Sequence, residues 1–309
     1  MKIITDLSNF TADRGTVVTI GTFDGVHCGH QKIIKRLTEA AKAEGLLSTV
    51  FTFFPHPRMI VQHDTQLRLL HTLAEKQTLL AALGVDLLIV QPFDKKFSQM
   101  SAEEFVEELL VKHLRVQKVI IGYDHRFGKN RTADIRDMHR FGEHYGFAVE
   151  EISAQEVDEV SVSSTKVREA LLSGQVEKAE SYLGVPYSLT GKVVHGQKLG
   201  RTLGYPTANI QVEEDYKLIP ADGVYVVYSL LEGRKVYGMM SIGKNPTIAD
   251  KGSSIEVHFL DYDGDLYDKS LTVYFIKYLR AEQKFASVAA LQQQIEQDEE
   301  QSRKAIALR

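Results

Sequence analysis

The sequence has a single cysteine, Cys28, among 309 residues. One thiol allows no internal disulfide, which is typical of proteins from a reducing compartment. Neither sign of charge is in large excess. The formal net charge is -4 at pH 7, so there is no basic field to attract nucleic acid and no acidic tail. We therefore expect a cytoplasmic protein without a nucleic-acid partner.

Long apolar runs are also absent. The longest stretch without Asp, Glu, Lys or Arg covers residues 45–57, which is too short to cross a bilayer. Residues 1–20 lack a basic start followed by a long apolar segment, so we expect no signal peptide. These absences exclude a transporter, a channel or an efflux protein, and we expect no membrane partner. The sequence does not indicate an oligomeric state.

What is present points to two domains, because a chain of 309 residues exceeds the usual size of a single core. In the first half, apolar runs alternate with amphipathic segments. Strands are expected at 15–21, 46–53, 85–93, 116–122 and 147–152, and helices at 30–45, 73–83 and 101–114. This alternation predicts an α/β domain, with a parallel sheet covered by helices on both faces.

Two of these helices carry further signals. The helix at 30–45 has an apolar stripe that ends at Gly45, formed by Ile33, Ile34, Leu37 and Ala41. The helix at 101–114 opens with Ser101, and Glu104 follows three residues later, which is the pattern of a capping box.

After about residue 185 the pattern changes to strand-like runs separated by turns. Glu232-Gly233 and Asp263-Gly264 occur where hairpin turns are expected, which predicts an antiparallel sheet or barrel. A last helix is predicted at about 286–302, with Val288, Leu291 and Ile295 on one side. We place the domain boundary within 182–191, giving domains 1–184 and 185–309.

The stretch IGTFDGVHCGH (20–30) joins the first expected strand to the first helix. Open α/β sheets place ligands at this edge, and a helix N-terminus attracts phosphate. His27 and His30 would donate to phosphoryl oxygens, and glycines allow a nucleotide to approach the backbone. The alternatives are two ordinary polar loop residues or a metal pair. Zinc pairs on one helix favour i, i+4 spacing, and no third ligand is evident nearby.

The stretch SVSSTKVREAL (161–171) begins another helix with Lys166 and Arg168 near its start. Plain helix capping by Ser or Thr is the simpler interpretation. Cations at a helix N-terminus oppose the helix dipole, however, which favours a polyanion in front of them. The segment is therefore a candidate clamp for a triphosphate.

Together, GTFDGVHCGH and VSSTKVR resemble the HxGH and (I/V)SSTxxR signatures of adenylyltransferases. FFPHP (53–57) and GYDHRFG (122–128) fit the same family in order and spacing. The chain resembles, over nearly its whole length, the bacterial bifunctional riboflavin kinase/FMN adenylyltransferase family, also called FAD synthetase. The resemblance implies a doubly wound, Rossmann-like nucleotidyltransferase domain. A six-stranded antiparallel β-barrel riboflavin kinase domain with a C-terminal helix would follow.

The resemblance also implies roles for residues in the first half. His27 and His30 would steady the α-phosphate of ATP, and Ser164, Thr165 and Arg168 would hold its β and γ phosphates. FMN phosphate would attack the α-phosphorus as an anion, so no general base is needed. The remaining expected contacts to ATP are Gly21, Phe23, Asp24 and Asp124. His56 would either touch the flavin or be a loop residue held between two prolines.

In the second half, GRTLGYPTANI (200–210) contains no P-loop. Thr207 and Asn209, two apart on a strand, would project from one face and offer oxygen ligands to Mg²⁺. An ordinary polar strand edge is the alternative. The segment resembles the Pro-Thr-Ala-Asn motif of riboflavin kinase, and ATP contacts are expected at Gly200, Gly204, Thr207 and Asn209.

Glu256, in IEVHF, matches the general base of that kinase, which would take the proton of the 5′ hydroxyl of riboflavin. On pattern alone, Glu256 and His258 would face outward from a strand whose Ile255, Val257 and Phe259 face inward. Arg280, in LRAEQKF, would lie near the flavin or nucleotide phosphate. The resemblance implies Mg-ATP, riboflavin and FMN as substrates, with FAD as the final product.

Four positions depart from the family pattern: His125 and Tyr205 where Phe is usual, Asp268 where Gly is usual, and Cys28 at a variable place. If only one half is active, His125 indicates that the adenylyltransferase is the half that has lost its activity. Two alternatives to a bifunctional enzyme therefore remain, namely a chain with one active half and a non-catalytic flavin-binding regulator.

Overall fold

The computed structural model describes residues 1–308 except 124, 154–161, 197–198 and 245–252. The chain forms two compact units, Met1–Ser163 and Ser164–Arg309. This division falls before the predicted boundary at 184/185. The helices α7 (Ser164–Leu172) and α8 (Val176–Leu183) are therefore grouped with the second unit. Each unit is described by itself.

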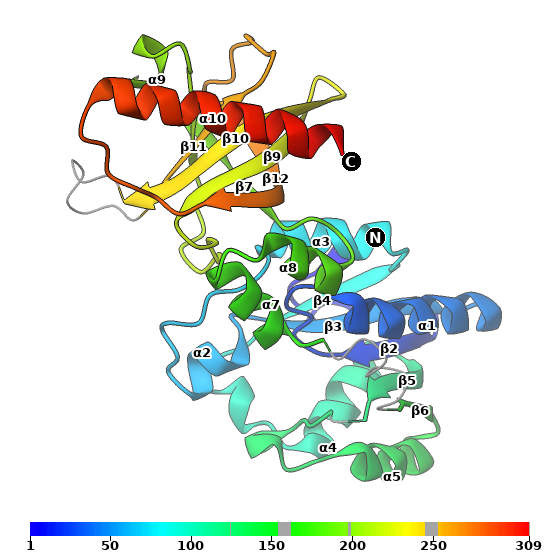
Figure 1. The fold of residues 1–309 in the computed structure, drawn as a ribbon. Coiled ribbons are helices and arrows are strands. Elements are labelled where there is room, and N and C mark those ends of the chain that lie inside the picture. The colour runs from blue at the N-terminus through cyan, green and yellow to red at the C-terminus, as the bar shows by residue number, and fades with distance from the viewer. Residues whose placement is uncertain (124, 154–161, 197–198, 245–252, 309) are drawn as a thin grey trace. The chain divides into compact units, whose positions relative to one another are not determined.

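The first unit is built on a six-stranded sheet in the order β1-β4-β3-β2-β5-β6, in which all pairs are parallel (Figure 1). The five predicted strands are confirmed. The sheet also contains a strand that was not predicted, β1, which pairs with β4. The bounds are β1 Lys2–Ile4, β2 Thr16–Ile20, β3 Leu47–Phe54, β4 Leu87–Pro92, β5 Val116–Gly122 and β6 Ala148–Ile152.

Helices cover both faces of this sheet, as predicted. One apolar core joins the sheet to α1 and α3 through Ile34, Leu37 and Leu80. The other joins the opposite face to η2 and α5 through Leu110 and Met138. The helices are α1 Cys28–Glu44, α2 Pro57–Val61, α3 Leu73–Ala82, α4 Ala102–Glu104, η2 Phe105–His113 and α5 Ile135–Tyr145, with short 3-10 turns at Phe97–Gln99 and Lys129–Arg131.

The local signals at the helix ends are confirmed. Gly45 ends α1 in the left-handed conformation, with φ 67°, and Ser101 and Glu104 form a reciprocal capping box. The helix that follows Ser101 differs from an ordinary α-helix, since η2 has π-type hydrogen bonds such as Leu114 N to Leu109 O at 3.1 Å. Side-chain periodicity does not separate these two helix types over so short a span.

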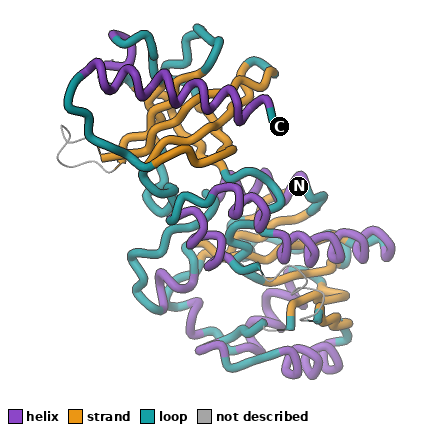
Figure 2. The backbone as a smooth tube through the Cα atoms, in the orientation of Figure 1, coloured by secondary structure: helices purple, strands orange, loops and turns teal. Residues whose placement is uncertain are grey.

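The second unit contains a closed six-stranded antiparallel barrel, in the order β10-β11-β8-β7-β12-β9. Figure 2 shows these strands gathered together, with the C-terminal helix lying across them. The predicted barrel is therefore confirmed. Its strands are β7 Ser188–Val194, β8 Ala208–Gln211, β9 Gly223–Leu231, β10 Arg234–Lys244, β11 Ser253–Phe259 and β12 Ser270–Arg280, and a short helix, α9, covers Leu199–Thr202.

One of the two predicted hairpin turns is confirmed. Glu232 and Gly233 join β9 directly to β10, with φ 51° and 76°, as a tight hairpin requires. The prediction for Asp263-Gly264 is wrong. These residues lie between β11 and β12, which are not neighbours in the barrel. A turn dipeptide marks a reversal of the chain but does not identify the strands that pair.

The C-terminal helix, α10 (Val288–Ala307), packs on β9, β10 and β12. It extends beyond the predicted end at 302, and its predicted apolar stripe is only partly correct. Val288 is 64% exposed, and the residues of α10 that are fully buried are the polar Asp298 and Ser302. Polar contacts to the barrel, described below, therefore contribute much of what holds this helix in place.

Candidate functional site

The loop between β2 and α1, residues 21–27, has an unusual backbone. Phe23, Gly25 and Val26 all have positive φ, at 46°, 91° and 41°. Positive φ is rare for an aromatic and rarer for a β-branched residue, and it costs on the order of 1–3 kcal/mol per residue. Phe23 and Val26 are nevertheless buried, and both belong to the core beneath α1. The surrounding packing holds the loop in this strained form at the carboxyl end of β2.

His27 and His30 form a stacked pair at the start of α1. His27 is the N-cap, and its Nδ1 accepts a hydrogen bond from the backbone N–H of His30 at 3.4 Å. The two rings stack with centroids 3.7 Å apart, and Phe23 meets the His30 ring edge-on at 5.1 Å. The prediction that both histidines share one side of the first turn is confirmed.

Burial favours the neutral form of both rings. It lowers the pKa of His27 to about 4, and together with the nearby His27 and Lys76 it holds the pKa of His30 well below its ordinary value. His30 Nδ1 is buried without a hydrogen-bond partner among the described residues. Because Nδ1 is buried without a partner, we assign the N–H of the neutral ring to Nε2. A neutral imidazole protonated there is a hydrogen-bond donor.

Two buried charged side chains support this loop, one from the loop itself and one from α3. Asp24 is 1% exposed, and its Oδ1 accepts the backbone N–H of Leu70 at 2.9 Å. The contact of Asp24 with ATP stays a prediction, and its carboxylate is turned into the protein. Lys76, from α3, is 5% exposed and donates from Nζ to the carbonyl of Thr22 at 2.7 Å.

Lys76 was not among the predicted site residues. A signal for it exists in the sequence, because Lys76 lies three residues after Leu73 and four before the buried Leu80. A lysine at that spacing falls on the apolar face of the helix. Lysine is almost never fully buried without a partner, so this placement marks it for attention.

The other predicted residues of the first unit are placed individually. Gly21 lies against the ring of Phe23, which an added Cβ would approach to 3.1 Å. His56 is the N-cap of α2, where its Nδ1 accepts from Arg58 N at 3.2 Å, so it has a local structural role whether or not it touches flavin.

Asp124 lies outside the described residues. His125 stacks on Phe127 at 5.9 Å, as the usual phenylalanine would be able to do.

Ser164, Thr165 and Arg168 all lie on α7, the first element of the second unit. Thr165 is exposed, whereas Ser164 and Arg168 are partly buried. The first turn of this helix has no acidic residue and contains Lys166. The positive charge at a helix N-terminus, which motivated the triphosphate prediction, is therefore present in the folded chain.

A second cluster of predicted residues meets on the barrel. Thr207 donates from its hydroxyl to Oε2 of Glu256 at 2.9 Å. Asn209 lies directly opposite Glu256 in the register between β8 and β11, so both side chains project from the same face. Ile255, Val257 and Phe259 are buried, as the alternation predicts. Glu256 is partly buried and hydrogen-bonded, so it is not simply a solvated residue on an outer face.

Glycines shape the backbone around this cluster. A Cβ on Gly200 would come within 2.3 Å of the carbonyl oxygen of Tyr205, and one on Gly196 within 2.3 Å of the Asn209 side chain. Gly204 has φ 84°, which favours glycine. The motif is therefore folded so tightly that Gly200 and Gly196 have no room for a side chain. This close packing places Thr207 and Asn209 beside Glu256.

Tyr205 connects the same motif to α10. Its hydroxyl donates to Oε2 of Glu299 at 3.0 Å, and its ring meets His258 edge-on at 5.1 Å. His258 Nδ1 is 2.8 Å from the carbonyl oxygen of Pro206. The usual phenylalanine would lack the bond to Glu299. In this chain the substitution therefore adds a hydrogen bond between the motif and the C-terminal helix.

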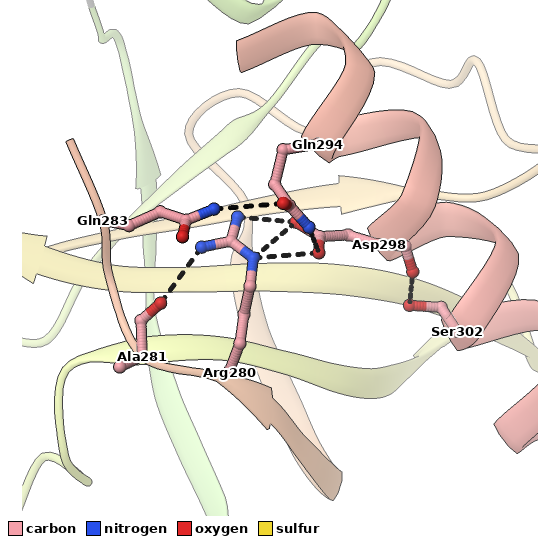
Figure 3. Close-up of polar contacts among 6 residues, drawn as sticks. All are labelled: Arg280, Ala281, Gln283, Gln294, Asp298 and Ser302. Carbon is pink, nitrogen blue, oxygen red and sulfur yellow. Dashed lines mark hydrogen bonds and ion pairs between the residues drawn. The ribbon is translucent and has the colours of Figure 1, made fainter. Parts of the chain in front are cut away.

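Arg280, predicted to bind flavin, is engaged with α10 (Figure 3). Its Nε and Nη2 donate to the carboxylate of Asp298 at 2.6–3.1 Å, and Nη1 donates to the carbonyl of Ala281 at 3.0 Å. Gln294 donates a further bond to Asp298 at 3.0 Å. The Asp298 side chain is 5% exposed and that of Arg280 22%. This arrangement fastens the end of β12 to the helix, and a contact of Arg280 with flavin stays a prediction.

Asp268 has a backbone conformation that favours glycine. It has φ 62°, the conformation that glycine usually supplies, and its carboxylate pairs with Lys192 at 2.8 Å. The Lys192 ammonium lowers the pKa of this carboxyl. Aspartate is one of the few residues other than glycine that tolerate this conformation.

Within the described part of the chain, no group of three or more His, Cys, Asp or Glu side chains is placed to hold a metal ion. Over the same residues, no helix is long and apolar enough to cross a membrane.

Two family models match the chain in sequence. One, described as FAD synthetase, matches residues 9–166, and the other, described as riboflavin kinase, matches residues 183–306. Among curated relatives, the bifunctional riboflavin kinase/FMN adenylyltransferase of Pseudomonas fluorescens is 42% identical over 300 residues, 96% of each chain. The protein of the same name from Escherichia coli K12 is 39% identical over 311 residues, covering 100% of this chain and 99% of the relative.

The fold is also found among solved structures. A crystal structure described as a macrolide-efflux protein from Streptococcus pneumoniae superposes with a TM-score of 0.88, at 32% sequence identity and over 98% of each chain. Its architecture therefore matches this chain along the entire length, although its description differs from those of the sequence relatives.

Proposed function

The chain belongs to the bifunctional riboflavin kinase/FMN adenylyltransferase family, and on that premise we propose how its residues carry out two ATP-dependent reactions. It phosphorylates riboflavin to FMN, and it adenylylates FMN to FAD. The observation that best supports the assignment of residues is the convergence of Thr207, Asn209 and Glu256 on one face of the barrel.

For adenylyl transfer, His27 and His30 bind the α-phosphate of ATP. A phosphate oxygen of FMN forms a bond to the α-phosphorus, and the bond to the bridging oxygen breaks, releasing pyrophosphate. No proton has to be removed from the nucleophile. The work of the protein is to align the groups and to stabilise charge as it develops on the phosphoryl oxygens. The neutral, stacked imidazoles of the strained loop suit that work as fixed N–H donors.

We assign Ser164, Thr165 and Arg168 to the β and γ phosphates of ATP. The cationic start of α7 supports this assignment. Gly21, Phe23, Asp24 and Asp124 are assigned to nucleotide binding, as the resemblance implies. Asp24 acts through the backbone of the loop rather than by direct contact, because its carboxylate is buried. His56 is assigned to the flavin side of this site.

For phosphorylation, the 5′ hydroxyl of riboflavin attacks the γ-phosphorus of ATP and ADP leaves. A neutral hydroxyl is a weak nucleophile, so Glu256 accepts its proton as the new bond forms. Gly200 and Gly204 allow the backbone of the motif to approach the nucleotide. Arg280 is assigned to the flavin or nucleotide phosphate, in addition to its contact with Asp298.

The residues of the barrel fit a magnesium ion. The hydroxyl of Thr207 and the amide of Asn209 are oxygen ligands of the kind Mg²⁺ accepts, and Glu256 places a carboxylate beside them. The Thr207 hydroxyl donates a hydrogen bond to Glu256, which leaves the lone pairs of its oxygen available to a cation. Mg²⁺ bound with ATP would neutralise charge on the phosphates, while Thr207 and Asn209 orient it.

The remaining assignments follow from the substrates. The partners are small molecules, namely riboflavin, FMN and Mg-ATP, with FAD as the product. We place the enzyme in the cytoplasm, where ATP is available, and we keep 184/185 as the boundary between the two catalytic modules. The riboflavin kinase model begins at 183, next to this boundary, whereas the FAD synthetase model ends earlier, at 166.

Chromatography of the flavins tests this proposal. The purified protein is incubated with Mg-ATP and riboflavin, and separately with Mg-ATP and FMN. We expect FMN and FAD from the first mixture and FAD from the second. FMN alone from the first, with no FAD from the second, would mean that one half is active. No product from either mixture would favour a flavin-binding regulator.

A further inference from the structure

Lys76 is the buried lysine beneath the loop that carries the two histidines. A lysine buried to 5% exposure is costly, because its charge loses water. Proteins keep such a group where it has partners or a function. The α3 helix would be easier to pack with an apolar residue here, as at Leu80 one turn later.

The ammonium of Lys76 has defined partners. Nζ donates to the carbonyl of Thr22 at 2.7 Å, and the hydroxyl of the buried Thr52 donates to the same oxygen at 3.1 Å. The Asp24 carboxylate lies near enough to raise the pKa of Lys76, although burial lowers that pKa more strongly. Asp24 is itself held by the backbone of Leu70. Two successive contacts therefore fix the loop from below, at Thr22 and at Asp24.

The loop needs such support because of its backbone strain. Positive φ at Phe23 and Val26 is unfavourable unless the surroundings enforce it. Thr22 immediately precedes these positions, so the two donors to its carbonyl act at the point where the chain leaves β2. Gln31 adds a bond at the other end, from Nε2 to the carbonyl of Val26 at 2.8 Å.

We propose that Lys76 is a positioning residue for adenylyl transfer, because its ammonium fixes the carbonyl of Thr22 and thereby the loop that presents His27 and His30 to the nucleotide. This proposal rests on the proposed function of the first unit. Lys76 does not touch the reacting atoms. It acts through the loop, and its charge acts on the ring of His30.

The second effect follows from the charges around His30. The described groups that act on its pKa are His27, at the start of α1, and Lys76, from α3, while Asp24 acts on Lys76. Protonation of His30 would add a second positive charge within the influence of Lys76, in a ring that burial already keeps neutral. The positive charge of Lys76 therefore makes His30 harder to protonate. Loss of that charge would raise the pKa of His30.

The test is Lys76→Met in the full-length protein, with both reactions measured on one preparation. Methionine keeps the length and volume but removes the charge and the donor. We expect kcat for FAD formation from FMN to fall by about 10- to 100-fold, the scale of a small misplacement of catalytic groups. The KM values for ATP and FMN should change less. The acid limb of kcat/KM should move to higher pH, and riboflavin phosphorylation should be retained.

Two further variants make the outcome unambiguous. Ala81→Met adds a methionine to the exposed side of α3 and should leave both reactions unchanged. Lys76→Gln keeps a hydrogen-bond donor without the charge, so it should show the same shift of the acid limb. Lys76→Gln also takes the place of Lys76→Met in the test if the methionine variant does not fold.

The proposal is overturned if a folded Lys76 variant keeps kcat within about twofold of the wild type with an unmoved acid limb. It is also overturned if both variants lose the two reactions in parallel with thermal stability, because Lys76 is then structural only. Failure of the wild-type protein to form FAD would instead contradict the proposed function, so the two failures are distinguishable.

Discussion

The hydroxyl of Thr207 and the carboxylate of Glu256 are joined by a hydrogen bond of 2.9 Å between the segment that leads into β8 and strand β11. One residue was predicted as a magnesium ligand and the other as a general base. The bond brings the two predicted roles into one site. It also orients both side chains, since the Thr207 hydroxyl donates the hydrogen bond and the Glu256 carboxylate accepts it, which leaves the lone pairs of the hydroxyl oxygen available to a cation.

This relationship predicts the effect of Thr207→Val. Valine has nearly the same shape but offers neither an oxygen ligand nor a donor to Glu256. We expect the Mg²⁺ concentration for half-maximal riboflavin phosphorylation to rise about tenfold or more, while FAD formation from FMN is unaffected. Titration of both rates with Mg²⁺ checks this. An unchanged magnesium requirement would remove Thr207 from the metal site.

The stacked histidines predict a selective loss in the first unit. His30→Ala should lower FAD formation from FMN by about 10²-fold or more, the usual scale for losing one donor to a transition state. Riboflavin phosphorylation should stay near normal, because its predicted residues lie on the barrel. Steady-state assays of both reactions make the comparison. If the variant instead loses a tightly bound zinc ion by metal analysis, the two histidines are metal ligands.

The same pair predicts how stability depends on pH. Burial lowers the pKa of His27 from 6.5 to about 4. Between these pH values the unfolded chain binds a proton that the folded chain does not. The free energy of unfolding therefore falls as pH drops from 6.5 towards 4, and the contribution of His27 is fully present above pH 6.5. This pKa shift corresponds to a change on the order of 3 kcal/mol in the free energy of unfolding over that pH range.

Calorimetry of the wild type and His27→Gln at pH 7 and pH 5 measures this contribution. The destabilisation between the two pH values should be smaller in the variant. His139→Gln, at an exposed position of α5, is the matched control and should behave as the wild type does. Equal pH dependence in all three proteins would mean that His27 is not held neutral by the fold.

The contact between Arg280 and Asp298 predicts a large stability effect in the second unit. Arg280→Met leaves a buried carboxylate unpaired and should destabilise this unit by about 3 kcal/mol. Asp298→Asn keeps the shape but weakens the same contact. Lys304→Met, which breaks an exposed pair with Glu300, is the control and should cost about 0.5 kcal/mol or less.

Kinetics of the same two variants separate a structural role from a flavin contact. If Arg280 also binds the flavin or nucleotide phosphate, Arg280→Met raises the KM for riboflavin or ATP, while Asp298→Asn raises neither as much. Equal effects of the two variants on KM would limit Arg280 to fastening α10.

Much of this fold was predictable, because its signals are local. Buried parallel strands read as continuous apolar runs, and Gly45, Ser101 and Glu104 mark helix ends through backbone chemistry that depends on nearby residues alone. The strand β1 was missed because it has only three residues and gains its identity by pairing with β4, which is distant in sequence. The failure at Asp263-Gly264 has the same origin, since strand pairing is set by tertiary structure.

The candidate sites divide in the same way. The motifs contain His27, His30, Thr207, Asn209 and Glu256, so the sequence identifies them. Lys76 and Asp298 lie in no motif. They stand out only because they are buried. Their burial depends on the packing of α3 against the loop after β2 and of α10 against β12. Only the spacing of Lys76 on an apolar helix face indicates its burial in advance.

The central claim is that one chain carries two separate chemistries, one that needs a base and one that does not. Glu256→Gln tests it most directly, with riboflavin phosphorylation and FMN adenylylation measured on a single preparation. Glutamine keeps the shape and removes the proton acceptor. The account predicts a loss of about 10²- to 10⁴-fold in phosphorylation with little change in the KM for ATP, while FAD formation from supplied FMN continues. Kinase activity within a few-fold of the wild type, or a parallel loss of both reactions in a folded protein, would contradict it.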